Sequence, residues 1–140
     1  MMKNREIMIV SKPGTRQRLI LNYLARYPFL DVKGIVSGSL TALELITNNC
    51  PDLLLIDYSN LTDDIAALIN KVKSENNQLQ IIVIADTNHQ RRKLINSGAD
   101  FAISSFKCES ELSIIFKEMM STTVNLSEPT NFGKVSTEEK

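Results

Sequence analysis

The sequence predicts an α/β fold in three layers, in which helices cover both faces of a parallel sheet. Five short apolar runs alternate with segments whose apolar residues recur at helical spacing. Several of the runs are continuous rather than alternating, which is typical of strands buried on both faces. Strands and helices that alternate in this way form right-handed βαβ units and therefore a parallel sheet. A chain of 140 residues has room for one such domain.

The five strands are predicted from runs rich in Ile, Val and Leu, which favour a pleated and buried backbone. In chain order they are 6–10 (EIMIV), 31–36 (DVKGIV), 52–57 (DLLLID), 80–85 (QIIVIA) and 101–104 (FAIS).

The first two helices are predicted from apolar stripes in 15–27 and 40–49. Thr41 and Glu44 have the spacing of a capping box at the start of the second. The stripes consist of Leu19, Ile20, Tyr23, Leu24 and Tyr27 in the first segment, and Leu40, Leu43 and Ile46 in the second.

Three further helices follow, and residues typical of helix ends mark two of them. Asp63 and Asp64 favour the start of the third helix, because carboxylates stabilise a helix N-terminus. Asn88 is a suitable N-cap for the fourth, and Gly98 suits its C-terminal end. The segments are 63–73, with Ile65, Leu68, Ile69 and Val72 on its stripe, then 88–97, and 109–120, with Leu112, Ile115, Phe116 and Met119.

Composition excludes several classes of protein. Lys and Arg number 16 and Asp and Glu also 16, which argues against a domain that grips nucleic acid by charge. Cys50 and Cys108 have no metal-type spacing, and no apolar run is long enough for a signal peptide or a membrane span. We therefore expect a soluble, cytoplasmic protein with a domain over 5–120, followed by a flexible polar tail or linker over 121–140.

The sequence offers no recognisable enzyme motif. His89 is the single histidine, so a metal site built on several histidines cannot form. The stretch SKPGTR lacks the Gly-Lys-Ser/Thr ending of a P-loop. We expect a protein that is not an enzyme.

Asp57 ends a run of buried residues and needs an explanation, because a buried carboxylate is costly without compensation. Ligands of open parallel sheets bind beyond the carboxyl ends of the strands. The motifs IMIV, PDLLLID, IIVIA and SGADFAIS resemble the receiver domain of bacterial two-component response regulators over about residues 5–120. The stretch ARYPFLDVKGIVSGSLTALELI is similar to receivers of the LuxR/NarL class. The resemblance implies a flavodoxin-like (βα)5 sandwich with strand order 2-1-3-4-5 and a phosphoacceptor at Asp57.

The same resemblance shows a degenerate metal site. The family holds Mg²⁺ with two acidic residues after the first strand, where this chain has Ser11 and Lys12. After the acceptor, where the family often has Met-Pro and then Gly, this chain has Asn60, Leu61 and Ile65, and Ser59 is a further degenerate position. We expect no metal site and no cofactor, with Mg²⁺ bound at most weakly through Asp57.

The residues of the family's switch are also replaced. Ala85 stands where the family has a Thr or Ser, and Ala102 where it has an aromatic residue. Ser105 stands in place of a Lys, and Lys107 follows two residues later. The pattern is that of an atypical receiver, or pseudo-receiver, in which the fold is retained and the phosphorylation switch is defective.

Lys12 is a candidate replacement for the metal. We expect its ammonium group to pair with Asp57, because the two residues follow neighbouring strands at one sheet edge. The alternative is that Lys12 extends into water, where Pro13 would direct it.

Three functions remain open at this point. The first is a degenerate receiver that acts as a signalling and protein-interaction module, and the second is a working receiver that a histidine kinase phosphorylates on Asp57. The third is a small-molecule or flavin binder. The resemblance implies a partner or homodimer surface on the fourth helix, fifth strand and fifth helix, near the basic cluster HQRRK at 89–93. We expect no direct DNA binding by these residues and no membrane partner.

Overall fold

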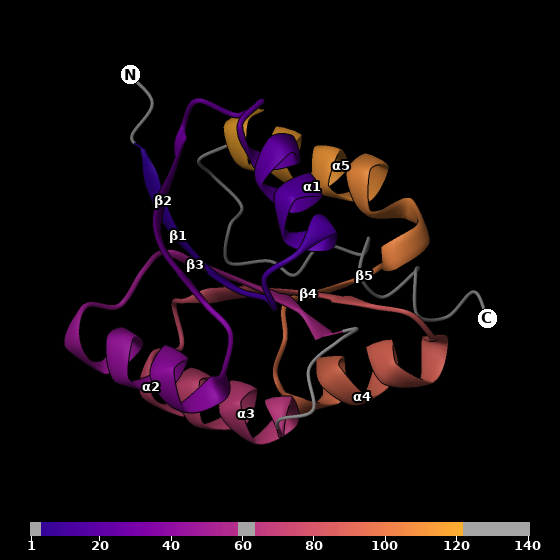
Figure 1. Ribbon diagram of the computed structural model, residues 1–140. Helices are drawn as coiled ribbons and strands as arrows, with labels where there is room; N and C mark the ends of the chain where they lie inside the picture. Colours follow the sequence, from indigo (N-terminus) through magenta and orange to yellow (C-terminus); the bar gives the residue numbers. More distant parts are fainter. Residues whose placement is uncertain (1–3, 59–63, 122–140) are drawn as a thin grey trace.

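A computed structural model describes residues 4–58 and 64–121 of the chain. The strands form one parallel sheet in the order β2-β1-β3-β4-β5, which confirms the predicted topology (Figure 1). From residue 122 on, the predicted tail lies outside the described residues. The elements are β1 (Arg5–Val10), α1 (Thr15–Leu24), β2 (Leu30–Val36), α2 (Ser39–Asn48), β3 (Leu53–Asp57), α3 (Ile65–Glu75), β4 (Gln80–Ala85), α4 (Asn88–Ser97), β5 (Phe101–Ser104), the short 3₁₀ helix η2 (Ser105–Lys107) and α5 (Cys108–Ser121).

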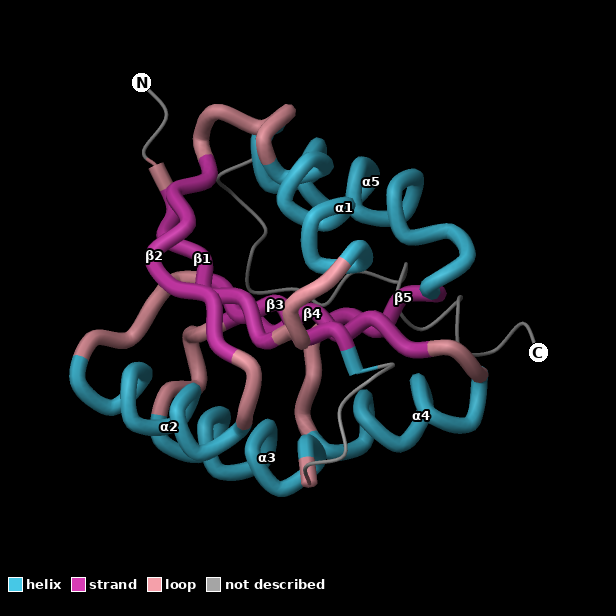
Figure 2. Tube along the Cα trace, in the orientation of Figure 1, coloured by secondary structure: helices cyan, strands magenta, loops and turns pink. Residues whose placement is uncertain are grey.

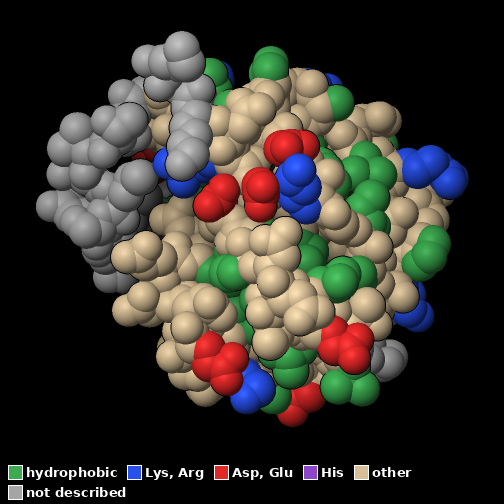
Figure 3. Space-filling model, turned by 90° about the vertical axis from the view of Figure 1, so that its left-hand side faces the viewer, with side chains coloured by type: hydrophobic (Ala, Val, Ile, Leu, Met, Phe, Trp, Pro, Cys, Tyr) green, Lys and Arg blue, Asp and Glu red, His purple; other side chains and the backbone are tan. Residues whose placement is uncertain are grey.

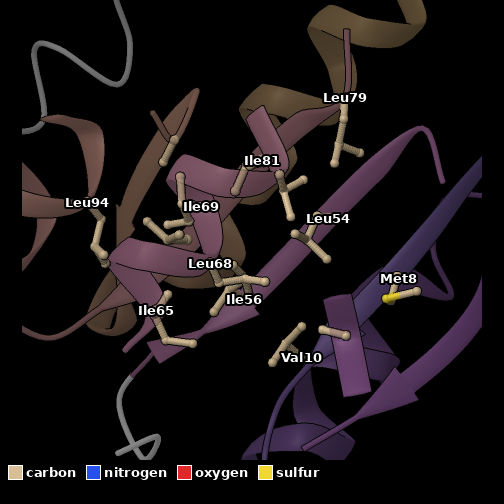
Figure 4. Packing of buried hydrophobic residues seen from close by; sticks show 14 of the residues in the cluster. Met8, Val10, Leu54, Ile56, Ile65, Leu68, Ile69, Leu79, Ile81 and Leu94 are labelled. Atoms are coloured by element: carbon tan, nitrogen blue, oxygen red, sulfur yellow. The ribbon is translucent and has the colours of Figure 1, made fainter. Parts of the chain in front are cut away.

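The sheet lies between two helical layers. Helices α1 and α5 cover one face, and α2, α3 and α4 cover the other (Figures 1 and 2). Each face of the sheet has its own buried cluster, because alternate residues of every strand point to opposite sides. On the α3 side, Ile65, Leu68 and Ile69 pack toward Leu54 and Ile56 of β3 (Figure 4). β3 is buried along its whole length, so Asp57 is reached only from the edge of the sheet.

All five predicted helices are confirmed, and most of their ends lie within one residue of the predicted ones. α1 ends at Leu24 rather than at 27, and α3 spans Ile65–Glu75 rather than 63–73. Two further differences concern the N-termini of α2 and α4. Asp64 caps α3 by accepting from Ala67 N at 3.1 Å, and Gly98 ends α4 with a φ of 124°. The predicted capping box at the start of α2 is wrong, because that helix begins earlier, after Gly38. The N-cap of α4 is Thr87 rather than Asn88.

Two residues predicted on buried stripes are exposed. Leu19 of α1 is 45% exposed and Leu40 of α2 is 79% exposed. Leu40 lies in the first turn of α2, and α1 buries only Ile20 and Leu24. In both helices, the apolar stripe in the sequence is wider than the helix face that packs against the sheet.

The side of the molecule shown in Figure 3 carries charges of both signs, in line with the equal numbers of basic and acidic residues. Acidic and basic side chains lie next to one another on the side of the molecule shown in Figure 3. In the described part of the chain, none of the helices has the length and apolar character needed to cross a bilayer.

Candidate functional site

The predicted site residues meet at the carboxyl end of the sheet, which is called the edge below, where the parallel strands end. Asp57 is the last residue of β3 and Ala85 the last residue of β4, while Ser11 follows β1 directly. Ser105 comes directly after β5. The structure thus brings Asp57 together with most of the altered positions, whereas Ser59 lies outside the described residues.

Arg16 neutralises the buried carboxylate of Asp57. Arg16 Nε donates to Asp57 Oδ2 at 2.8 Å, and Nη2 donates to Oδ1 at 2.9 Å. The side chain of Asp57 is 3% exposed and that of Arg16 is 36% exposed, so Arg16 lies on the solvent side of the carboxylate. A bidentate pair of this kind is strong and geometrically specific. The hydrogen bond to Asp57 is the main cause of the raised pKa of Arg16.

The prediction that Lys12 pairs with Asp57 is wrong. Lys12 is exposed, and the guanidinium of Arg16 takes the place expected for its ammonium group. Pro13 and Gly14 turn the chain between them, and Gly14 has a φ of 143°, a conformation that favours glycine. The turn directs Lys12 outward and places Arg16 in the first turn of α1, facing the sheet edge.

The sequence prediction missed Arg16 as the partner of Asp57, although its position in the chain is a signal for that role. Arg16 is the second residue of the predicted helix 15–27, and the start of that helix has to lie beside the carboxyl ends of the strands. Lys12 was predicted as the partner of Asp57 because it stands in the loop where the family has its metal ligands, whereas Arg16 lies in the first turn of the following helix.

The residues at this edge do not suit Mg²⁺. Ser11 is fully buried, its Oγ donates to Lys12 O at 3.1 Å, and its own carbonyl accepts from Gln17 Nε2 at 3.2 Å. Mg²⁺ is held in proteins by carboxylates and water. Both Asp57 oxygens already bind a guanidinium, and no group of three metal-ligating side chains occurs among the described residues.

Ser105 has a different partner from the lysine it replaces. Its hydroxyl donates to Asp86 Oδ1 at 2.6 Å. After the larger contribution of Asp57, the charge of Asp86 also raises the pKa of Arg16. Arg16 is therefore held in a field from two carboxylates, one buried and one exposed.

Ala85 and Ala102 are both fully buried in the cluster on the α3 side of the sheet. They lie on adjacent strands, because β4 and β5 pair with Val83 opposite Ala102 and Ala85 opposite Ser104. Neither side chain carries a hydrogen-bonding group or a ring. Above them, Arg91 of α4 is 8% exposed and donates to the carbonyl of Ala85.

A cleft separate from Asp57 lies at the opposite end of the sheet, where the strands begin. It has a volume of about 810 Å³ and is lined by Arg5, Cys50, Lys73 and Asp100 among others. Lys73 already binds Asp100 Oδ2 at 3.0 Å and the carbonyl of Leu79 at 2.7 Å. The cleft is thus separate from Asp57, and its lysine serves the fold.

Solved structures share this architecture at low sequence identity. The RcsB response regulator of Salmonella typhimurium aligns with a TM-score of 0.73 at 17% identity, over 85% of this chain and 60% of that one. A LuxR-family response regulator from Aurantimonas sp. SI85-9A1 gives 0.74 at 13% identity, over 95% and 99%. The receiver domain of NarL from Mycobacterium tuberculosis gives 0.72 at 18% identity, over 86% and 99%.

The chain has the receiver fold. This confirms the predicted fold class and the likeness to receivers of the LuxR/NarL class. The chain spans about 60% of the RcsB chain. RcsB has also been solved as two dimers bound to two parallel DNAs. No family model matches the chain, and no curated protein matches it by sequence.

Proposed function

We propose that this chain is a receiver-like signalling and interaction module whose output does not depend on phosphorylation of Asp57. The observation that carries the proposal is the bidentate pair between Arg16 and Asp57. An internal cation compensates the carboxylate, and the acidic metal ligands after β1 are replaced by Ser11 and Lys12.

Arginine replaces the charge of a metal but not its chemistry. In phosphoryl transfer, a metal ion bridges oxygens and neutralises the charge that develops on the moving group. A guanidinium is a fixed donor that is always charged and has no exchangeable ligand position. To attack a phosphodonor, Asp57 would have to release an oxygen from Arg16. Ser11 and Lys12 supply no carboxylate after β1 to hold a metal ion that would neutralise the incoming phosphoryl group.

A second obstacle concerns how a change at Asp57 would be transmitted to the outer surface. A modification shifts a conformational equilibrium only if it contacts the two states differently. Ala85 has no hydroxyl to follow a phosphoryl group, and Ala102 has no ring to move. Phosphorylation of Asp57 would therefore leave the outer surface largely unchanged.

The partner surface that we propose consists of α4, β5 and α5. His89, Arg92 and Lys93 of α4 are exposed, and Ile114 of α5 is 43% exposed. A protein partner or a second copy of this chain would bind there, and DNA would not contact these residues directly. Such a module would work in a reducing, cytoplasmic setting, in line with the free thiols of Cys50 and Cys108.

The decisive experiment is treatment with acetyl phosphate and Mg²⁺, followed by intact mass and by light scattering. We expect no phosphoryl adduct on the wild type and no change in oligomeric state. The control is Asp57→Asn, which removes the acceptor and keeps the shape of the side chain. A stoichiometric adduct on the wild type, absent from Asp57→Asn and accompanied by a change of assembly, would contradict the proposal.

One observation favours a second function, that of a working phosphoacceptor. Asp57 is retained at the end of β3, and Arg16 is exposed enough, at 36%, to swing onto phosphoryl oxygens. Arginine binds phosphate in a bidentate manner as readily as carboxylate. This function requires a phosphoryl adduct on Asp57 that changes the assembly, which is the outcome that contradicts the first function, so the same experiment separates them.

A further inference from the structure

A buried arginine that has no acidic partner among the described residues lies at the junction of β4 and α4. Arg91 Nη1 donates to the carbonyl of Ala85 at 3.4 Å, and Nη2 donates to Asn88 Oδ1. Its Nε is buried and has no hydrogen-bond partner in the described part of the chain. None of the ion pairs formed within residues 4–58 and 64–121 includes Arg91.

This arrangement is costly, and the position of the helix increases the cost. A buried cation without a counter-ion loses hydration that nothing replaces. Arg91 also lies in the first turns of α4, where the helix dipole disfavours positive charge. The two acceptors it does reach come from the last residue of β4 and the first residue of α4, so the guanidinium joins strand and helix directly.

Neighbouring side chains hydrogen-bond the backbone amides of the same junction. Gln90 Oε1 accepts from the amides of Asp86 and Thr87 at 3.0 and 3.2 Å. Thr87 Oγ1 in turn accepts from the amide of Gln90 at 3.1 Å, which completes a capping box. The turn between β4 and α4 is thereby held from its exposed side by Gln90 and from its buried side by Arg91.

We propose that Arg91 is a latch that fixes α4 in one position on the sheet. This role of Arg91 rests on the proposed function, because it keeps the partner surface of α4 in one position whether or not Asp57 is phosphorylated. Leu94 of α4 shares a buried cluster with Ala85 and Ala102, whose short side chains let the helix lie close to β4 and β5. Arg91 then links α4 to the end of β4 through the Ala85 carbonyl, and the helix cannot shift without breaking that contact.

The test is amide hydrogen exchange of Arg91→Met without any phosphodonor. Methionine keeps an unbranched apolar stem and removes the charge and both hydrogen bonds. We expect the amides of Asp86, Thr87 and Gln90 to exchange about tenfold faster, while amides of β1 and β3 keep their rates. The matched control is Arg92→Met, because the next residue is exposed and its replacement should leave these amides unchanged.

A second variant, Asn88→Ala, removes only one acceptor and does not disturb the core. It should accelerate the same amides to a smaller extent than Arg91→Met. Unchanged exchange in Arg91→Met, or an equal increase throughout the domain or in Arg92→Met, would overturn the latch. A phosphodonor-dependent change in the wild type would instead overturn the proposed function and leave the exchange result standing.

Discussion

Replacing Arg16 by Gln should destabilise the domain by about 2 kcal/mol. The expectation lies between two limits, because exposed ion pairs contribute ~0.2–1 kcal/mol and breaking a buried pair costs ~3–5 kcal/mol. Asp57 is 3% exposed and belongs to the buried limit. Arg16 is 36% exposed, so water can partly hydrate the stranded carboxylate, and the cost falls below that limit.

The assay is urea unfolding followed by circular dichroism, with a double-mutant cycle. Asp57→Asn removes the charge that Arg16→Gln would strand, so the double variant should recover most of the loss. We expect a coupling energy of about 1.5 kcal/mol, which is about tenfold in the folding equilibrium constant. Arg18→Gln is the matched control, because Arg18 is an exposed arginine of the same helix and should change stability by less than ~0.5 kcal/mol.

The outcome that would refute the reasoning is additivity. If the two single variants sum to the double within ~0.5 kcal/mol, the residues do not interact as the geometry indicates. Salt gives an independent check, since screening affects exposed charges far more than buried ones. A coupling energy that disappears at high salt would place the pair on the surface.

Three further predictions concern the metal, a thiol and a turn. An NMR titration with Mg²⁺ should show no saturation at sub-millimolar metal, and saturation there would mean that Ser11 and Lys12 do not disable the site. Burial raises the pKa of Cys108 from 9.0 to about 12. The unfolded thiol therefore ionises first, stability falls as the pH rises from 9 to 12, and Cys108→Ala should flatten that loss in alkaline urea titrations. Gly98→Ala should cost ~1–3 kcal/mol, because Gly98 has a φ of 124° and its Cβ would lie 3.3 Å from a lysine side chain. Gly34→Ala, whose nearest neighbour would be 4.0 Å away, is the control that should stay near neutral in the same thermal melts.

The fold was predictable because its signals are local. Each strand is a short apolar run, each helix an apolar stripe, and their alternation restricts the topology to a parallel sheet. Leu19 and Leu40 were misjudged because exposure depends on where neighbouring elements end. A residue in the first turn of α2 can match the helical period and still lie beyond the sheet that the helix covers.

The location of the site was predictable, and its chemistry only in part. Asp57 had to lie at the carboxyl edge, because β3 ends there whatever the side-chain details. Which cation meets it depends on the direction of one turn, at Gly14, and on the rotation of α1 about its axis. A shift of one residue in the start of that helix would point Arg16 elsewhere, and periodicity does not fix helix starts to one residue.

The proposed function puts Arg16 in the place of a metal ion, and this changes what the carboxyl end of the sheet can do. A metal ion binds and leaves, so a site built on it has an occupied and an empty state that a cell can use. A guanidinium belongs to the chain, is charged at every physiological pH, and gains its full interaction with Asp57 on folding. In the proposed function, the free energy of that contact enters folding stability and not a switching equilibrium. Asp57 then has a structural role that does not require phosphorylation, because loss of the carboxylate would leave Arg16 without this ion pair.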